Sequence, residues 1–198
     1  MRTAEHPNLN ISASNVGLSV DGSNEMEKSF YHSLIFNENI EIIFCSPLRR
    51  SLETILSIKK SYEMSGSEKK KSFPKIIALP YIREALSTYS DKGPLKEELE
   101  KEFPQVDFSH LPYFWWFEAY SNNSLKKLKK KEKIHIEPEL YIKMRANNFL
   151  FFLSYCIREK NIFVVSHDLF LRRIFKEVFQ FSEIRRTKEG NITGLINK

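Results

Sequence analysis

The chain has few cysteines and no long apolar run, and each shortage excludes a class of protein. Its 198 residues include only Cys45 and Cys156, too few for a disulfide scaffold. Both lie in apolar stretches, so we expect buried, reduced thiols and a reducing compartment. The longest apolar stretch, residues 147–157, is about half the ~20 residues that a membrane-spanning helix needs. The N-terminus also lacks the pattern of a secretory signal. We therefore expect a cytoplasmic protein, or alternatively a nuclear one, without membrane insertion.

Most of the net charge comes from one short segment. The chain carries 31 lysines and arginines against 25 acidic residues, a net charge of +6. Residues 126–133 contain six lysines and one glutamate and so supply +5 of it. This run lies in a low-complexity stretch, about 121–137, which we interpret as a solvated, lysine-rich loop insertion. An electrostatic contact of this loop with RNA or anionic lipid is the alternative, but nucleic acid is not the expected partner.

Helical and strand-like patterns alternate along the chain. Short apolar runs predict strands at 40–45, 75–79 and 161–165. Helical periodicity predicts helices at 25–38, 47–63, 94–103, 138–160 and 168–179. The length fits one domain, and we see no internal repeat. Alternating strands and helices predict a single α/β domain over residues 1–198 with a mostly parallel sheet.

Two strand-to-helix junctions carry residues suited to an anion. In FCSPLRRSLET, a strand leads through Ser46 to Arg49 and Arg50 at a helix start, where free backbone N–H groups attract anions and a guanidinium matches phosphate oxygens. In FVVSHDLFLRR, a strand ends at His167 and Asp168. Because such strand ends gather at one edge of an open sheet, we expect the two junctions to meet. Taken singly, such an arginine pair is more often surface decoration, and such a histidine more often makes a structural hydrogen bond.

Four segments, in order from residue 2 to about 180, resemble the histidine phosphatase superfamily in its phosphoglycerate mutase-like branch of plants, fungi and protists. They are MRTAEH, CSPLRRSLET, IREALSTYSDKGPLKEELEKEFPQVDF and FVVSHDLFLRRIF, and the pair Trp115–Trp116 also fits. The resemblance implies a three-layer α/β/α sandwich with a mostly parallel central sheet. It also implies phosphoryl chemistry without metal or cofactor, on a phosphorylated small molecule or a phosphoprotein.

The resemblance assigns a role to individual residues. Arg2 and Arg50 match the two arginines that hold the phosphoryl oxygens, and His167 matches the second histidine of that site. Glu84 matches the acid that protonates the leaving oxygen, which requires a raised pKa or a local proton source. Arg145 matches an arginine that orients the segment containing this glutamate.

The N-terminal segment departs from the family pattern. Thr3 occupies the position of the nucleophilic histidine, and a threonine hydroxyl is a poor nucleophile unless a base removes its proton. Family members also carry an apolar central strand before the Arg-His motif, whereas here Met1 precedes Arg2. We therefore expect a sheet that lacks its first strand. A truncated gene model of an active enzyme and a non-catalytic relative both explain these departures.

Three functions follow from these observations. The first is a phosphomonoesterase, with phosphatase activity favoured over mutase activity. The second is a pseudophosphatase that binds phosphate or a phosphoprotein without turnover, because Thr3 replaces the nucleophile. The third is an electrostatic binder that uses the lysine-rich loop. Asp168, where the family has glycine, places a carboxylate beside the expected anion, and we interpret it as a helix N-cap.

Overall fold

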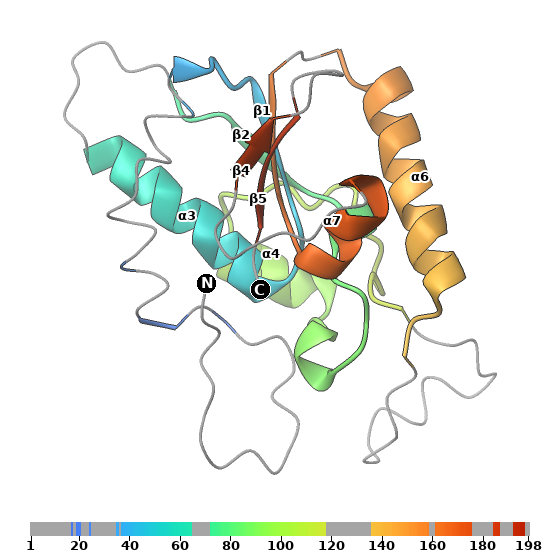
Figure 1. Ribbon diagram of the computed structural model, residues 1–198. Helices are drawn as coiled ribbons and strands as arrows, with labels where there is room; N and C mark the ends of the chain where they lie inside the picture. Colours follow the sequence, from blue (N-terminus) through green and yellow to red (C-terminus); the bar gives the residue numbers. More distant parts are fainter. Residues whose placement is uncertain are drawn as a thin grey trace.

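The chain forms a five-stranded sheet with helices on both faces, as a computed structural model shows (Figure 1). It describes residues 37–64, 72–117, 136–158, 161–175, 184–186 and 192–196, together with positions 17, 19, 20, 24 and 35. Most of the predicted helix at 25–38 and the whole lysine run fall outside these residues.

The sheet is mostly parallel, as the sequence predicts. Its strands are β1 (Ile42–Cys45), β2 (Lys75–Ala78), β3 (Ile162–Ser166), β4 (Ile184–Arg186) and β5 (Ile192–Ile196). Their order across the sheet is β2-β1-β3-β5-β4, and only β4 runs antiparallel to its neighbour. The first three strands match the predicted runs to within two residues at each end, whereas β4 and β5 were not predicted.

Helices cover both faces of the sheet (Figure 1). On one face lie α3 (Arg49–Met64) and α4 (Lys96–Glu102), and on the other lie α6 (Glu139–Cys156) and α7 (Asp168–Phe175). Successive side chains of a strand point to opposite faces, so Ile43 packs toward α3 and Phe44 packs toward α6. The two resulting apolar clusters lie on the two faces of the sheet, so the layers are arranged as α/β/α. Two short 3-10 helices, η1 (Pro80–Ile82) and η2 (Tyr89–Asp91), follow β2.

The strand β3 has a parallel partner on each side. On one side β3 pairs in parallel with β5 along all five of its residues, from Ile162 opposite Ile192 to Ser166 opposite Ile196. On its other side β3 pairs with β1. The backbone of β3 is therefore paired on both sides, which avoids the cost of unpaired groups inside a sheet.

The two cysteines have different surroundings. Both thiols are free; Cys45 at the end of β1 is fully buried, whereas Cys156 is exposed. The prediction of a buried thiol is correct for Cys45 and wrong for Cys156, because Cys156 ends α6 beyond Phe149, the last buried residue of that helix. Burial raises the pKa of the Cys45 thiol well above its ordinary value.

Among the described helices, none is long and apolar enough to cross a membrane.

Candidate functional site

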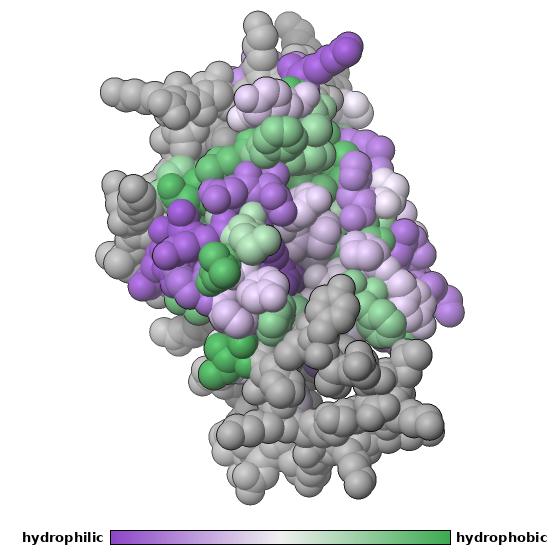
Figure 2. Space-filling view, turned by 90° about the vertical axis from the view of Figure 1, so that its right-hand side faces the viewer, coloured by the Kyte–Doolittle hydropathy of each residue, from purple (hydrophilic) through white to green (hydrophobic). Residues whose placement is uncertain are grey.

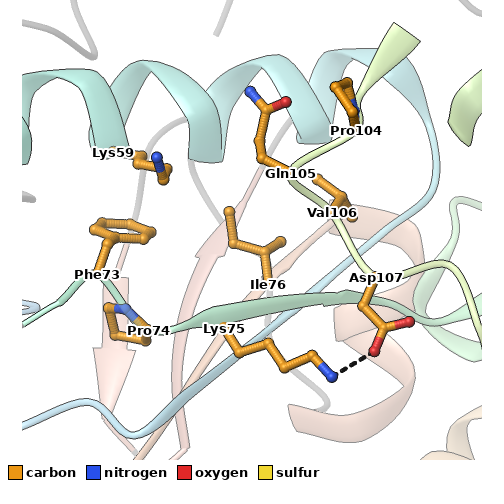
Figure 3. Close-up of a pocket in the computed structure, with 9 residues that line it drawn as sticks. All are labelled: Lys59, Phe73, Pro74, Lys75, Ile76, Pro104, Gln105, Val106 and Asp107. Carbon is orange, nitrogen blue, oxygen red and sulfur yellow. Dashed lines mark ion pairs between the residues drawn. The ribbon is translucent and has the colours of Figure 1, made fainter. Parts of the chain in front are cut away.

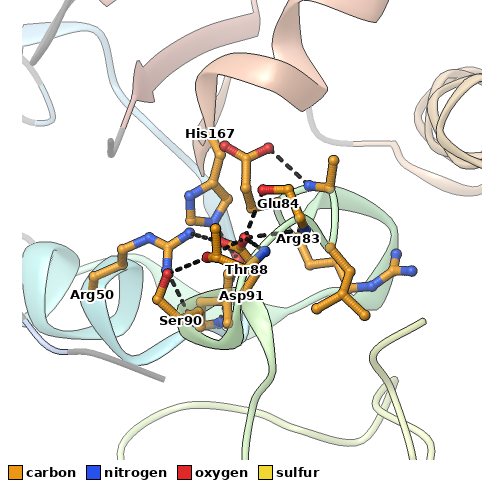
Figure 4. A network of polar contacts seen from close by, with 12 residues as sticks. Arg50, Arg83, Glu84, Thr88, Ser90, Asp91 and His167 are labelled. Atoms are coloured by element: carbon orange, nitrogen blue, oxygen red, sulfur yellow. Dashed lines mark hydrogen bonds and ion pairs between the residues drawn. The ribbon is translucent and has the colours of Figure 1, made fainter. Parts of the chain in front are cut away.

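Polar residues gather where three neighbouring parallel strands end. Ser46 directly follows β1, His167 directly follows β3, and η1 leads from β2 to Glu84. The Ser166 hydroxyl donates to the carbonyl of Ile82 at 2.7 Å and so ties the end of β3 to the segment before Glu84. Segments far apart in the sequence therefore meet at one edge of the sheet, as the two junctions predicted (Figure 4).

His167 is completely buried at this edge. Its Nε2 lies 2.8 Å from the hydroxyl of Ser46 and 3.2 Å from the hydroxyl of Ser51. Ser46 in turn accepts from the backbone N–H of Leu48 at 3.3 Å, at the start of α3. The first turn of α3 therefore fixes the imidazole, and the hydroxyls accept from or donate to Nε2 according to its tautomer.

Arg50 is buried on the same helix, and an acidic turn orients it. Nη1 donates to the carbonyl of Ser90 and Nη2 donates to Asp91 Oδ1, each at 3.0 Å. The other oxygen of Asp91 accepts four hydrogen bonds from the backbone N–H and hydroxyl groups of Ser87 and Thr88. The donors left over include the buried Nε of Arg50, which has no hydrogen-bond partner; the same is true of the Nε of Arg83 and of Arg173.

The neighbouring arginine has a different environment. Arg49 is half-exposed, and its guanidinium pairs with Glu102 on α4, at the surface. Arg50 is 4 % exposed and faces the strand ends. The sequence resemblance selected Arg50 rather than Arg49 for the anion, and the structure places only Arg50 at this edge, beside His167 (Figure 4).

Glu84 is a buried carboxyl group next to Arg50. Burial raises its pKa to about 7, and the charge of Asp91 also raises it. The hydrogen bond from the Ala85 N–H and the charges of Arg50 and Arg145 act in the opposite direction. That N–H donates to Oε1 at 2.8 Å. A carboxyl group with this pKa carries a proton for much of the time at neutral pH and is suited to general acid chemistry. This is the property that the resemblance requires of Glu84.

A buried ion cluster holds the segment that contains Glu84. Oε1 of Glu137 accepts from Arg83 Nη2 at 2.8 Å and from Arg145 Nε at 2.9 Å. The other oxygen of Glu137 accepts from Arg145 Nη2 at 3.0 Å and from the backbone N–H of Leu86 at 3.3 Å. Nη1 of Arg145 also donates to the carbonyls of Tyr81 and Arg83. The backbone is thus held on both sides of Glu84, as the resemblance expects of Arg145.

The charges of this cluster balance one another. Burial by itself raises the pKa of Glu137, but the hydrogen bond and charge of Arg145 and the charge of Arg83 outweigh it, so the pKa of Glu137 is lowered. Burial and the nearby charge of Arg145 lower the pKa of Arg83 to about 9. Sequence reasoning missed both partners: Glu137 was assigned to the loop insertion, and Arg83 was read only as part of the motif around Glu84. The one local signal was that Glu137 lies eight residues before Arg145.

Asp168, beside His167, is neutralised by its own helix. It is the first residue of α7, and its two carboxylate oxygens accept from Nε and Nη2 of Arg172 one turn later. The distance from Nε of Arg172 to Oδ1 of Asp168 is 2.8 Å. The structure therefore shows an ion pair within α7 where the sequence suggested an N-cap, and this pairing offsets the negative charge that Asp168 adds near the site.

Of the predicted site residues, the structure brings Arg50, Glu84 and His167 together. Arg2, the predicted first phosphate arginine, and Thr3, at the position of the nucleophile, lie outside the described residues. Within the described part of the chain, no cluster of three or more His, Cys, Asp or Glu side chains is arranged to hold a metal ion.

A hollow on another part of the surface contains none of these residues (Figure 3). It lies against β2, with Phe73, Ile76 and Val106 as its apolar lining. The ammonium group of Lys75 pairs with Asp107 at its edge, at 2.6 Å. The hollow holds no buried charge without a partner and is separate from the strand ends.

Comparison with known proteins gives no identification. The chain matches no protein-family model, and a search of curated proteins found no match either.

Proposed function

We propose that this chain is a phosphoglycerate mutase-like member of the histidine phosphatase superfamily that hydrolyses or transfers the phosphoryl group of a phosphomonoester. Two independent kinds of observation support the proposal. Four sequence segments resemble the family in the correct order, and three residues that the resemblance selects lie together at the carboxyl edge of a mostly parallel sheet.

One observation carries the proposal furthest: a buried guanidinium lies beside a buried carboxyl group that is protonated for part of the time at neutral pH. Arg50 is 4 % exposed, and burial raises the pKa of the adjacent Glu84 to about 7. A phosphomonoester complements both groups. Its charged oxygens accept hydrogen bonds from Arg50 and His167, and its ester oxygen takes a proton when it leaves.

Each group then has one chemical task. Arg50 and His167 hold the phosphoryl oxygens, and the fixed turn around Asp91 keeps Arg50 in place before the substrate arrives. As the bond between phosphorus and the ester oxygen breaks, phosphorus bonds to the oxygen of an attacking water. Glu84 donates its proton to the ester oxygen, so that the alcohol leaves neutral, and the proton that the water releases restores the acid. This donation requires the protonated carboxyl, so its rate falls as pH rises above about 7.

The residue at the nucleophile position favours a second candidate function. Thr3 stands where the family has histidine, and its hydroxyl attacks phosphorus poorly without a base. With the anion site kept and the nucleophile lost, the chain would bind phosphate or a phosphorylated protein without turnover. The lysine run at 126–133 lies outside the described residues and carries no part of either candidate.

Hydrolysis of p-nitrophenyl phosphate by the full chain tests the first candidate. We expect Arg50→Ala and His167→Ala each to lower kcat/KM by about 100-fold or more, as the loss of one preorganised donor does elsewhere. Arg49→Ala is the matched control, since its surface ion pair contributes little, and it should leave the activity unchanged.

Calorimetry with phosphate and vanadate separates the two candidates. Binding that depends on Arg50 without any hydrolysis would support the second candidate, and Thr3→His should then create activity. Hydrolysis that is lost with Arg50 supports the first. A chain that neither hydrolyses the ester nor binds either anion contradicts both.

A further inference from the structure

Glu137 is a buried acidic residue two positions before the start of α6. Figure 2 shows the side of the molecule on which α6 lies, where hydrophilic and hydrophobic groups are interspersed. Glu137 is only 3 % exposed and contributes almost nothing to the surface, whereas Glu139 forms an exposed ion pair with Arg173. A buried carboxylate loses its hydration, so the partners that compensate this loss show what the residue holds in place.

One set of these contacts fixes the backbone after Glu84. The backbone N–H of Glu137 donates to the carbonyl of Leu86 at 2.8 Å, and the N–H of Leu86 donates to Oε2 of Glu137 at 3.3 Å. Both backbone groups of Leu86 therefore bond to Glu137. Ala85, the residue between, donates its N–H to the Glu84 carboxyl at 2.8 Å. A shift of the chain at Leu86 would therefore move the carboxyl group of Glu84.

The same buried carboxylate reaches the backbone before Glu84 through Arg145. Its two oxygens accept from Nε and Nη2 of Arg145, which leaves Nη1 to donate to the carbonyls of Tyr81 and Arg83. The guanidinium also lies over the ring of Phe170 on α7, 5.2 Å from its centroid. The paired contacts with the carboxylate and the ring together fix the plane of the guanidinium.

We propose that Glu137 is a positioning residue for the reaction, which holds the backbone on both sides of Glu84 and so directs the Glu84 carboxyl toward the leaving oxygen. The inference rests on the proposed function, in which Glu84 is the acid. Arg145 bonds to the backbone before Glu84 and Leu86 follows it, and Glu137 joins the two. Acid catalysis depends on such placement, since a displacement of about 1 Å can lower a rate about 100-fold.

The leaving group of the substrate shows whether a residue acts through the acid. An alkoxide is a poor leaving group and needs a proton as its bond to phosphorus breaks. The p-nitrophenolate ion is stable as an anion and needs far less assistance. Misplacement of the proton donor should therefore slow an alkyl phosphate much more than an aryl phosphate, whereas general damage to the site slows both alike.

Hydrolysis of glycerol 2-phosphate and of p-nitrophenyl phosphate by the full chain tests the proposal. We expect Glu137→Gln to lower kcat about 100-fold for the alkyl ester and less than about fivefold for the aryl ester. Inhibition by inorganic phosphate should stay unchanged, because Asp91 and not Glu137 holds Arg50. The matched control is Glu139→Gln, which neutralises the exposed acid two residues away and should leave both rates unchanged.

Glu137→Asp separates the position of the carboxylate from its charge. This variant keeps a negative charge between the two arginines, which protects the fold. Its side chain is one methylene group shorter and cannot keep all four contacts of the natural carboxylate. We expect the same selective loss with the alkyl ester, and circular dichroism shows that each variant is folded. An equal loss with both esters, or no loss with either, would overturn the proposal.

A double variant tests whether Glu137 acts through Glu84. Glu84→Gln alone should slow the alkyl ester by about 100-fold or more. Adding Glu137→Gln should slow it little further, because the acid that Glu137 positions is already absent. Losses that multiply would contradict action through Glu84. A natural chain that hydrolyses neither ester overturns the proposed function and this inference with it, so the two kinds of failure are distinguishable.

Discussion

The strand-end site and the outer face of α6 depart from ordinary burial in opposite directions. At the strand ends, charged groups are buried: Arg50, Glu84 and Glu137 have almost no exposed surface. On α6, large apolar groups such as Phe151 and Tyr155 are exposed. Folding of the isolated chain favours neither arrangement, since buried charges lose hydration and exposed apolar groups gain nothing.

The two regions differ in whether contacts within the chain offset this unfavourable burial or exposure. The strand-end charges are stabilised by one another, through the pairs of Glu137 with Arg83 and Arg145 and of Arg50 with Asp91. The exposed apolar side chains of α6 have no comparable stabilising contacts within the described part of the chain. Changes at the strand ends should therefore lower the stability of the chain much more than changes at the exposed positions of α6.

The largest expected loss of monomer stability comes from Glu137→Ala. This change leaves the buried guanidinium groups of Arg83 and Arg145 close together without a counter-ion, so we expect a loss of about 3–5 kcal/mol in the free energy of unfolding. Urea unfolding measures it. Glu139→Ala is the control, because Glu139 pairs with Arg173 at the surface and should cost less than about 1 kcal/mol. Equal losses for both variants would contradict the role of the cluster.

A somewhat smaller and pH-dependent effect is expected at Glu84. Its pKa is about 7 when folded and near the ordinary 4.5 when unfolded, so between these values the folded chain binds the proton more tightly. The stability of the natural chain should therefore fall as pH rises through this window, by about 3 kcal/mol in total.

The Glu84→Gln variant, which cannot ionise, tests this expectation. Its free energy of unfolding should gain about 3 kcal/mol relative to the natural chain between about pH 4 and pH 8, as urea unfolding at a series of pH values would show. The same relative stability of the two chains at both ends of the range would rule out a raised pKa for Glu84.

The smallest effect is expected on the exposed face of α6. Phe151→Ser should change the free energy of unfolding by no more than about 0.5 kcal/mol, as at other exposed positions. Phe149→Ala, two residues away on the buried face of the same helix, should cost about 3–5 kcal/mol. Urea unfolding measures both, and a large loss for Phe151→Ser would show that this face of α6 belongs to the core.

Much of the fold could be predicted from local pattern. Apolar runs of β-branched residues located β1, β2 and β3, and helical spacing located α3, α6 and α7. The pairing of β5 with β3 could not be predicted, because the run at 192–196 includes Gly194 and Thr193 and carries little strand signal of its own. Its place is decided by the free edge of β3, a feature of the assembled sheet.

The candidate site was also partly predictable, because local patterns locate the strands that position it. Arg50, Glu84 and His167 each follow a predicted strand, and parallel strands bring their ends together. The bond between Arg83 and Glu137 joins residues 54 positions apart, and no local pattern encodes such a pairing. The raised pKa of Glu84 depends on burial in the folded chain, which the sequence does not display.

By itself, the sequence determined the alternation of strands and helices and the choice of Arg50 over Arg49. These follow from local periodicity and from the order of motifs along the chain. Only the tertiary structure decided which face of α6 is covered, which charges neutralise one another and which strand lies beside β3. Those outcomes depend on contacts between distant segments, and such contacts exist only once the layers have packed.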